Sequence, residues 1–165
     1  MFREMRRKKQ VLSLEETEAV LERGTSGVLS VSGDDGYPYG VPVSYIYEDG
    51  KIYFHCGRSG HKIDAIAGNE KVSFCVIDKD QIVPEEFTTY FRSAVAFGRA
   101  RIIEDDGAKR EAVRKLAVKY CPALSEESIE KAIDNEFPGL CMVEIAIDHL
   151  SGKEAIELVR ARETK

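Results

Sequence analysis

The segment 37–62, YPYGVPVSYIYEDGKIYFHCGRSGHK, constrains the fold more than any other part of this 165-residue chain. Two runs rich in β-branched and aromatic residues flank Glu48-Asp49-Gly50, and an Asp-Gly pair between such runs is typical of a β-hairpin. The first run, 37–47, contains two prolines, and proline cannot donate a hydrogen bond to a β-ladder. We therefore expect 37–47 to form one long strand at a sheet edge or bulge, paired with 51–56.

The turn that follows this hairpin is a candidate anion site. Gly57-Arg58-Ser59-Gly60 precedes a predicted helix over 61–67. Backbone N–H groups at a helix start point outward, and the helix dipole adds about half a positive charge there. With Arg58, His61 and Lys62 nearby, the turn has the chemistry to bind a phosphate. The apolar run 41–45 beside it can carry a flat ring attached to that phosphate.

Other interpretations of Gly57-x-x-Gly60-His61-Lys62 are less favoured. A P-loop needs G-x-x-x-x-G-K-[ST], and Ile63 stands where its hydroxyl residue would be. A nucleic-acid GxxG clamp lies between two helices, and the net charge of −5 disfavours nucleic acid as a partner. A metal site is not expected, because the adjacent strand residues His55 and Cys56 point to opposite faces. A solvated turn without a ligand is the remaining alternative.

The rest of the chain has the pattern of an α+β protein that is mainly β. We expect helices over 14–23, 108–121 and 125–135, strands over 26–32, 71–78, 88–104 and 140–149, a loop over 79–87, and a further strand over 155–159. Gly98 is expected to mark a bend or bulge. Six or seven strands joined mostly by tight turns, with helices inserted rather than alternating, favour an antiparallel barrel.

Size and composition favour a single soluble domain over 1–165, with a basic arm at 1–12 and a charged tail at 150–165. Hydrophobic residues make up 43% and charged residues 32% of the chain, which is ordinary for a globular protein. No apolar run is long enough to span a bilayer, so no membrane partner is expected. The basic start lacks the apolar segment and cleavage site of a signal peptide, so we expect a cytoplasmic protein.

Several motifs taken together resemble one known family. They are the run YPYGVPVSYIYEDGKIYFHCGRSGHKIDAI, the opening Arg6-Arg7-Lys8, Tyr90-Phe91-Arg92-Ser93 followed by Phe97-Gly98-Arg99, and the late Ser151-Gly152-Lys153. In this order, over about the whole chain, they resemble the flavin-binding proteins related to pyridoxamine 5′-phosphate oxidase, particularly the branch of nitroimidazole-resistance proteins. The resemblance implies a split β-barrel, a homodimer, and FMN bound in a cleft at the subunit interface.

The resemblance also implies which residues contact FMN. They are Pro42, Val43, Ser44 and Tyr45 along the isoalloxazine ring, His55 and Cys56 beside the ring and ribityl chain, Ser59, His61 and Lys62 at the phosphate, and Ser93 at a further flavin contact. Arg58 either serves the phosphate or faces water. His55 is the candidate proton donor near the ring.

The chain departs from the oxidases in two places. Its tail, Val159-Arg160-Ala161-Arg162, lacks the histidine of their Arg-x-His-x-Arg motif, and Tyr45 and Tyr47 replace their basic residues on the ring strand. Oxidation of pyridoxamine phosphate is therefore disfavoured. We expect instead a reductase in which a reduced nicotinamide delivers hydride to FMN, which then reduces a small planar acceptor such as a nitroaromatic. The alternatives are a non-catalytic flavin or haem carrier or sensor, and a reductase of the same fold that uses a deazaflavin.

Overall fold

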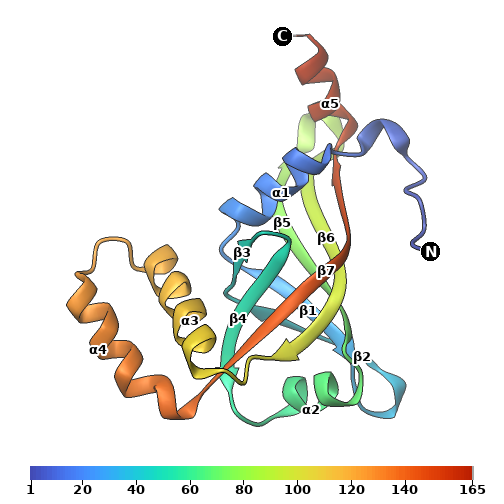
Figure 1. Ribbon diagram of the computed structural model, residues 1–165. Coiled ribbons are helices and arrows are strands. Elements are labelled where there is room, and N and C mark those ends of the chain that lie inside the picture. The colour runs from blue at the N-terminus through green and yellow to red at the C-terminus, as the bar shows by residue number, and fades with distance from the viewer. Residues whose placement is uncertain (165) are drawn as a thin grey trace.

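The computed structural model describes residues 1–164 and contains one antiparallel sheet of seven strands (Figure 1). The order across the sheet is β2-β1-β5-β6-β7-β4-β3. The strands are β1 (Gly27–Ser32), β2 (Pro38–Val43), β3 (Ile46–Glu48), β4 (Lys51–Gly57), β5 (Lys71–Val83), β6 (Thr88–Ile102) and β7 (Leu140–Glu154). The sheet curls around one core, and its edge strands β2 and β3 do not pair with each other. The predicted mainly-β split barrel is thus confirmed.

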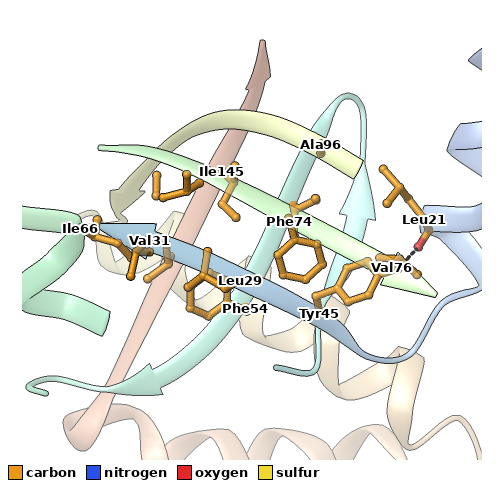
Figure 2. Close-up of a cluster of buried hydrophobic side chains, with 14 of the residues drawn as sticks. Leu21, Leu29, Val31, Tyr45, Phe54, Ile66, Phe74, Val76, Ala96 and Ile145 are labelled. Carbon is orange, nitrogen blue, oxygen red and sulfur yellow. Dashed lines mark hydrogen bonds between the residues drawn. The ribbon is translucent and has the colours of Figure 1, made fainter. Parts of the chain in front are cut away.

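Helices close the ends of the barrel and cover part of its outer side. They are α1 (Leu14–Arg23), α2 (His61–Gly68), α3 (Asp106–Tyr120), α4 (Glu126–Glu136) and α5 (Ile156–Glu163). Helices α1 and α2 lie at opposite ends of the barrel (Figure 1), and Leu21 of α1 and Ile66 of α2 join the interior core (Figure 2). Helices α3 and α4 form a second apolar cluster on the outside of β7, around Met142. No helix within residues 1–164 is long and apolar enough to cross a membrane.

Large side chains from most of the strands fill the interior (Figure 2). Tyr45, Phe54 and Phe74 are among the largest fully buried side chains. The rings of Tyr45 and Phe74 meet edge to face with their centroids 4.9 Å apart, an arrangement that aromatic pairs favour. Burial alternates along β4, with Ile52 and Phe54 pointing inward, as expected for a strand with one face on the core.

The prediction of one long strand over 37–47 is wrong. β2 pairs with β1, whereas β3 pairs with β4, so the chain leaves one edge of the sheet after Val43 and joins the opposite edge at Ile46. The Asp-Gly hairpin is confirmed for its β3–β4 part. The expectation that the prolines lie on an edge is also confirmed, because β2 is an edge strand.

The predicted loop over 79–87 is also wrong for most of its length. β5 continues to Val83 and pairs with Thr88 across a short 3₁₀ turn, Pro84–Glu86. A register shift between Ile77 and Lys79 interrupts the alternation, which hides the continuing strand from a sequence pattern.

Gly98 lies at the predicted irregularity, since the β6–β7 register shifts between Phe97 and Gly98. A Cβ at Gly98 would lie 2.3 Å from the carbonyl oxygen of Ala146, so the close approach of these strands requires glycine. The predicted bend is confirmed.

Residues 156–163 form a helix, α5, so the expected strand over 155–159 is wrong. β7 runs past the predicted end to Glu154, which is fully buried and pairs with Arg92. The N–H of Ala155 then donates to the carbonyl of Phe91, which ends the pairing, and α5 begins. Glu157 near its start and Arg160 and Arg162 near its end suit the helix dipole.

Ion pairs with the carboxylate of Asp78 link α1 and β6 to β5. Arg23 donates to both oxygens of Asp78 at 2.5 and 2.7 Å, and Arg92 donates to it at 3.3 Å. The hydrogen bonds from Arg23 hold the pKa of Asp78 below its usual value, although partial burial opposes this shift.

We expect Asp78→Asn to lower the free energy of unfolding by about 1.5–3 kcal/mol at pH 7, because charge-assisted hydrogen bonds are lost. The folded-state pKa of Asp78 lies below the unfolded value of about 3.9, so its contribution is present above pH 4 and is lost as the pH falls through the folded pKa. Urea unfolding at pH 7 and pH 3 tests this, with Asp80→Asn as the control. An equal loss at both pH values would contradict the assignment.

Candidate functional site

Two stretches of sheet edge remain without a second strand partner and border the same core. β2 pairs only with β1, and β4 beyond Tyr53 pairs only with β7 within residues 1–164. Half-buried side chains from both stretches, including Val43 and Cys56, pack against the interior core. We call these two stretches, 38–43 and 54–57, the open seam. Edge strands present N–H and C=O groups that can bind a ligand.

The chain crosses between the sheet edges at one end of the seam, through Ser44 and Tyr45. Ser44 is exposed, whereas Tyr45 is fully buried and its hydroxyl donates to the carbonyl of Leu21 at 2.7 Å (Figure 2). The N–H of Tyr45 donates to the hydroxyl of Tyr120 at 2.8 Å. Burial, followed by the nearby Tyr120 and Asp78, raises the pKa of Tyr45 well above its usual value. Tyr45 therefore anchors the crossing, with its polar groups bonded inside the chain.

The start of α2 lies at the other end of the seam. Gly60 precedes it with φ +125°, a conformation that favours glycine, and a Cβ there would meet nothing within 4 Å. No side chain caps the helix, and the first amides bonded to the Gly60 carbonyl are those of Ile63 and Asp64. The N–H groups of His61 and Lys62 come before these bonds and are available to an anion in front of the helix. These available N–H donors suit a phosphate group.

The first two side chains of α2 lie on the two borders of the seam. The ring of His61 stacks on Tyr39 of β2 with centroids 4.2 Å apart, and its Nε2 lies 3.7 Å from Oδ2 of Asp34. Lys62 is close enough to Cys56 of β4 to affect its thiol. Burial raises the pKa of Cys56 to about 11, the adjacent Cys141 adds to this, and the Lys62 ammonium opposes it. The helix start thus bridges β2 and β4.

The structure gathers most of the predicted contact residues along the seam. Pro42, Val43 and Ser44 lead to the crossing, Cys56 lies on the facing edge, and Ser59, His61 and Lys62 form the other end. Arg58 does not simply face water, because its Nη1 donates to the carbonyl of Pro138 at 3.0 Å.

Two predicted residues lie apart from this group. His55 is exposed and projects from the face of β4 opposite to Cys56. Ser93 lies in β6, opposite Ile77 of β5. Ile77 is six residues, or about 20 Å, from the start of β5 at Lys71. Since α2 leads into the start of β5, a single chain does not bring Ser93 to His61 and Lys62.

Sequence reasoning missed Tyr39, Asp34 and Tyr120. The alternation of β2 places Tyr39 on the inner side of the strand, so the sequence pattern predicts the position of Tyr39 once β2 is known to pair with β1. Tyr120 had no such signal, because it lies 75 residues from Tyr45 on a helix whose apolar face has an ordinary core pattern.

Comparison with known proteins identifies the family. Residues 13–154 match the family described as pyridoxamine 5'-phosphate oxidase. No significantly similar curated protein was found.

Solved structures share the fold over most of the chain. A candidate 5-nitroimidazole antibiotic resistance protein from Bacteroides thetaiotaomicron is 22% identical, with 87% of this chain and 86% of that chain covered and a TM-score of 0.71. An FAD-binding protein from Mesorhizobium loti is 25% identical, with coverages of 88% and 95% and a TM-score of 0.64. An FAD and haem binding protein from Mycobacterium smegmatis is 20% identical, with coverages of 89% and 73% and a TM-score of 0.69.

The family match spans most of the sequence, and the open sheet with its inserted helices is the fold that the resemblance predicted. The chain therefore belongs to the pyridoxamine 5'-phosphate oxidase family.

Proposed function

We propose that this protein binds a flavin, FMN, in the open seam, with the phosphate at the start of α2 and the ring along β2. The observation that carries the proposal is the uncapped helix start, where Lys62 and His61 meet free backbone amides at one end of two unpaired sheet edges. The FAD-binding protein from Mesorhizobium loti, at 25% identity, supports a flavin as the ligand. When bound, a flavin supplies the hydride and electron chemistry.

The phosphate contacts follow from the groups at this end. The ammonium of Lys62, the hydroxyl of Ser59 and the first amides of α2 donate to phosphate oxygens, and each charge-assisted bond contributes about 1.5–3 kcal/mol. The stacking of His61 on Tyr39 holds the imidazole at the same end.

The ring contacts come from the two borders. Pro42, Val43 and Ser44 offer backbone groups along the ring, and Tyr45 fixes the end of that stretch from the core. The thiol of Cys56, with its pKa raised to about 11, stays neutral at pH 7 and places no charge beside the ring.

We further propose a homodimer that shares its cofactors across the outer face of β2, β1, β5 and β6. Pro42, Val28, Cys75 and Val95 stand directly opposite one another across these four strands. Val28 is 36% exposed, and the neighbouring Ile77 is 65% exposed. Such a continuous apolar surface is typical of an interface. A second copy seated here supplies its own Ser93 to the flavin, a contact that one chain cannot make.

With FMN in place, the proposed activity is a reductase that takes hydride from a reduced nicotinamide and passes it to a small planar acceptor such as a nitroaromatic. His55 stays a proposed proton donor on the strand that borders the seam, but its exposed ring projects from the face of β4 opposite to Cys56, so it would have to reach the flavin around the edge of that strand.

The absorbance spectrum of the purified protein, followed by mass spectrometry of the released cofactor, tests the proposal. Release of FMN supports it, while FAD or a deazaflavin identifies another cofactor and failure to bind any flavin rejects it. Consumption of NAD(P)H with and without a nitroaromatic then separates the reductase from a non-catalytic flavin or haem carrier, for which no turnover is expected.

We expect Lys62→Ala to raise the dissociation constant for FMN about ten-fold or more, because one charge-assisted bond to the phosphate is lost. Riboflavin lacks the phosphate, so its affinity should hardly change. Titration of flavin fluorescence measures both constants, and Lys131→Ala on the exposed side of α4 is the control. Equal weakening of both ligands would argue against a phosphate contact.

We expect Val28→Glu to convert the dimer to a monomer and to weaken FMN binding with it, since the charge lies in the middle of the apolar row. Sedimentation velocity and FMN titration measure the two effects. Val118→Glu makes the same change on the exposed side of α3, and this variant should keep the dimer mass expected for the wild-type protein. A Val28→Glu protein that remains dimeric would rule out this face.

We expect Cys56 to react slowly with iodoacetamide at pH 7, with a rate that rises about ten-fold per pH unit toward pH 11 because the thiolate is the nucleophile. Bound FMN should protect it. Lys62→Ala should slow the reaction further, since loss of the ammonium raises the pKa of the thiol. Peptide mass spectrometry follows Cys56, and Cys121 in the same samples shows whether protection by FMN is local.

A further inference from the structure

Helices α3 and α4, together with the 3₁₀ turn Phe137–Gly139, form an insertion between β6 and β7. This helical insertion packs on the outside of β4 and β7, to one side of the barrel in Figure 1. The insertion contacts the rest of the chain at both ends of the open seam.

Tyr120, the last residue of α3, holds the end where the chain crosses between edges. Its hydroxyl accepts from the N–H of Tyr45 at 2.8 Å. The same oxygen lies 2.9 Å from the carbonyl oxygen of Tyr45 and 2.5 Å from that of Thr25, and it has one proton to donate to them. Residue 45 lies between β2 and β3, outside both ladders, so one phenol satisfies backbone groups that the sheet leaves unpaired.

The neighbouring Lys119 strengthens this attachment. Its ammonium donates to the carbonyl of Gly24 at 2.6 Å and lies 4.7 Å from the centroid of the Tyr45 ring. The end of α3 therefore fixes both the backbone and the side chain of Tyr45.

Arg58 ties the other end of the seam to the same insertion. Its Nη1 donates to the carbonyl of Pro138 at 3.0 Å, and Arg58 is part of the turn that leads into α2. The 3₁₀ turn is in turn braced on α3, because the ammonium of Lys109 donates to the carbonyl of Phe137 at 3.2 Å and lies 4.1 Å from its ring centroid.

From these contacts we infer that the helical insertion sets the separation of the two ends of the flavin site, with Tyr120 and Arg58 as its positioning residues. Tyr120 acts through the backbone of Tyr45 on the ring end, and Arg58 acts through the 57–60 turn on the phosphate end. The inference rests on the proposed function. An insertion outside the barrel thus controls a part of the binding geometry that the contact residues alone do not supply.

The first test is Tyr120→Phe, which removes only the hydroxyl. We expect the dissociation constants for FMN and riboflavin to rise by the same factor, about ten-fold, because the change acts on the ring end. The absorbance bands of the bound flavin should shift as well. Tyr47→Phe is the matched control, since it also removes one phenol hydroxyl, which donates to the side chain of Glu18 at 2.8 Å rather than to the crossing. Wild-type affinity for both ligands in Tyr120→Phe would overturn the inference.

Hydrogen exchange at the Tyr45 amide tests the attachment without any flavin. This amide should exchange faster in Tyr120→Phe, while amides of the buried strand β6 keep their wild-type rates. Unchanged exchange would overturn the inference. If the wild-type protein binds no flavin at all, the proposed function fails while the exchange result still decides whether Tyr120 holds the crossing.

The second test is Arg58→Gln, which removes the cation from the other end. Positioning through Pro138 predicts weaker FMN binding together with faster hydrogen exchange of the 57–60 amides in the flavin-free protein, whereas a direct contact with the phosphate predicts weaker FMN binding with unchanged exchange and overturns the role of Arg58. Should Tyr120→Phe be unfolded at the assay temperature, Lys119→Met replaces it, with the same equal loss for both ligands expected and wild-type affinity as the contradicting result.

Discussion

The chain crosses from one edge of the open sheet to the other between Val43 and Ile46. The residues that make this crossing cannot also pair the two edges with each other, so they cannot close the sheet. The two residues of the crossing cannot pair in either ladder. The fold compensates by burying Tyr45 and by bonding its backbone to Tyr120. The unpaired edges of β2 and β4 accompany this crossing, and the groups proposed to contact the ring lie along them.

Local charge, rather than the charge of the whole molecule, suits this site to an anion. The net charge of −5 repels anions at long range. At the start of α2, free amides and Lys62 offset this over a few ångströms, while Asp34 near His61 limits the positive charge on the β2 border. The site is therefore selective by geometry, since an anion gains little until it reaches the helix start.

Features that depend on neighbouring residues were predictable from the sequence, and those that depend on distant contacts were not. The Asp-Gly hairpin, the glycine turn before α2 and the helix over 14–23, which begins at a capping box formed by Ser13, are set by local chemistry, and all three are present. The broken strand depends on a phenol far along the chain, and the helix at 156–163 depends on the burial of Glu154 against Arg92. The order of the motifs along the sequence predicted the family, and most of the proposed phosphate and ring contacts lie along one seam. The separation of Ser93 from these contacts could be seen only from the strand register in the structure.

The helical insertion also decides which side of the barrel a second copy can approach. It packs on part of the outer side of β4 and β7, so a partner would meet the insertion when approaching the proposed ligand site from that direction. On the other side, the row from Pro42 to Val95 starts on the same strand that borders the seam. A partner seated on that row lies next to the proposed ring position, and Ser93 stands two residues beyond the end of the row on β6. In the proposed homodimer, two-fold symmetry would give each flavin one seam and one Ser93 from opposite copies. That proposed arrangement would place the predicted contact residue Ser93 at the flavin of the opposite copy rather than at the flavin of its own chain.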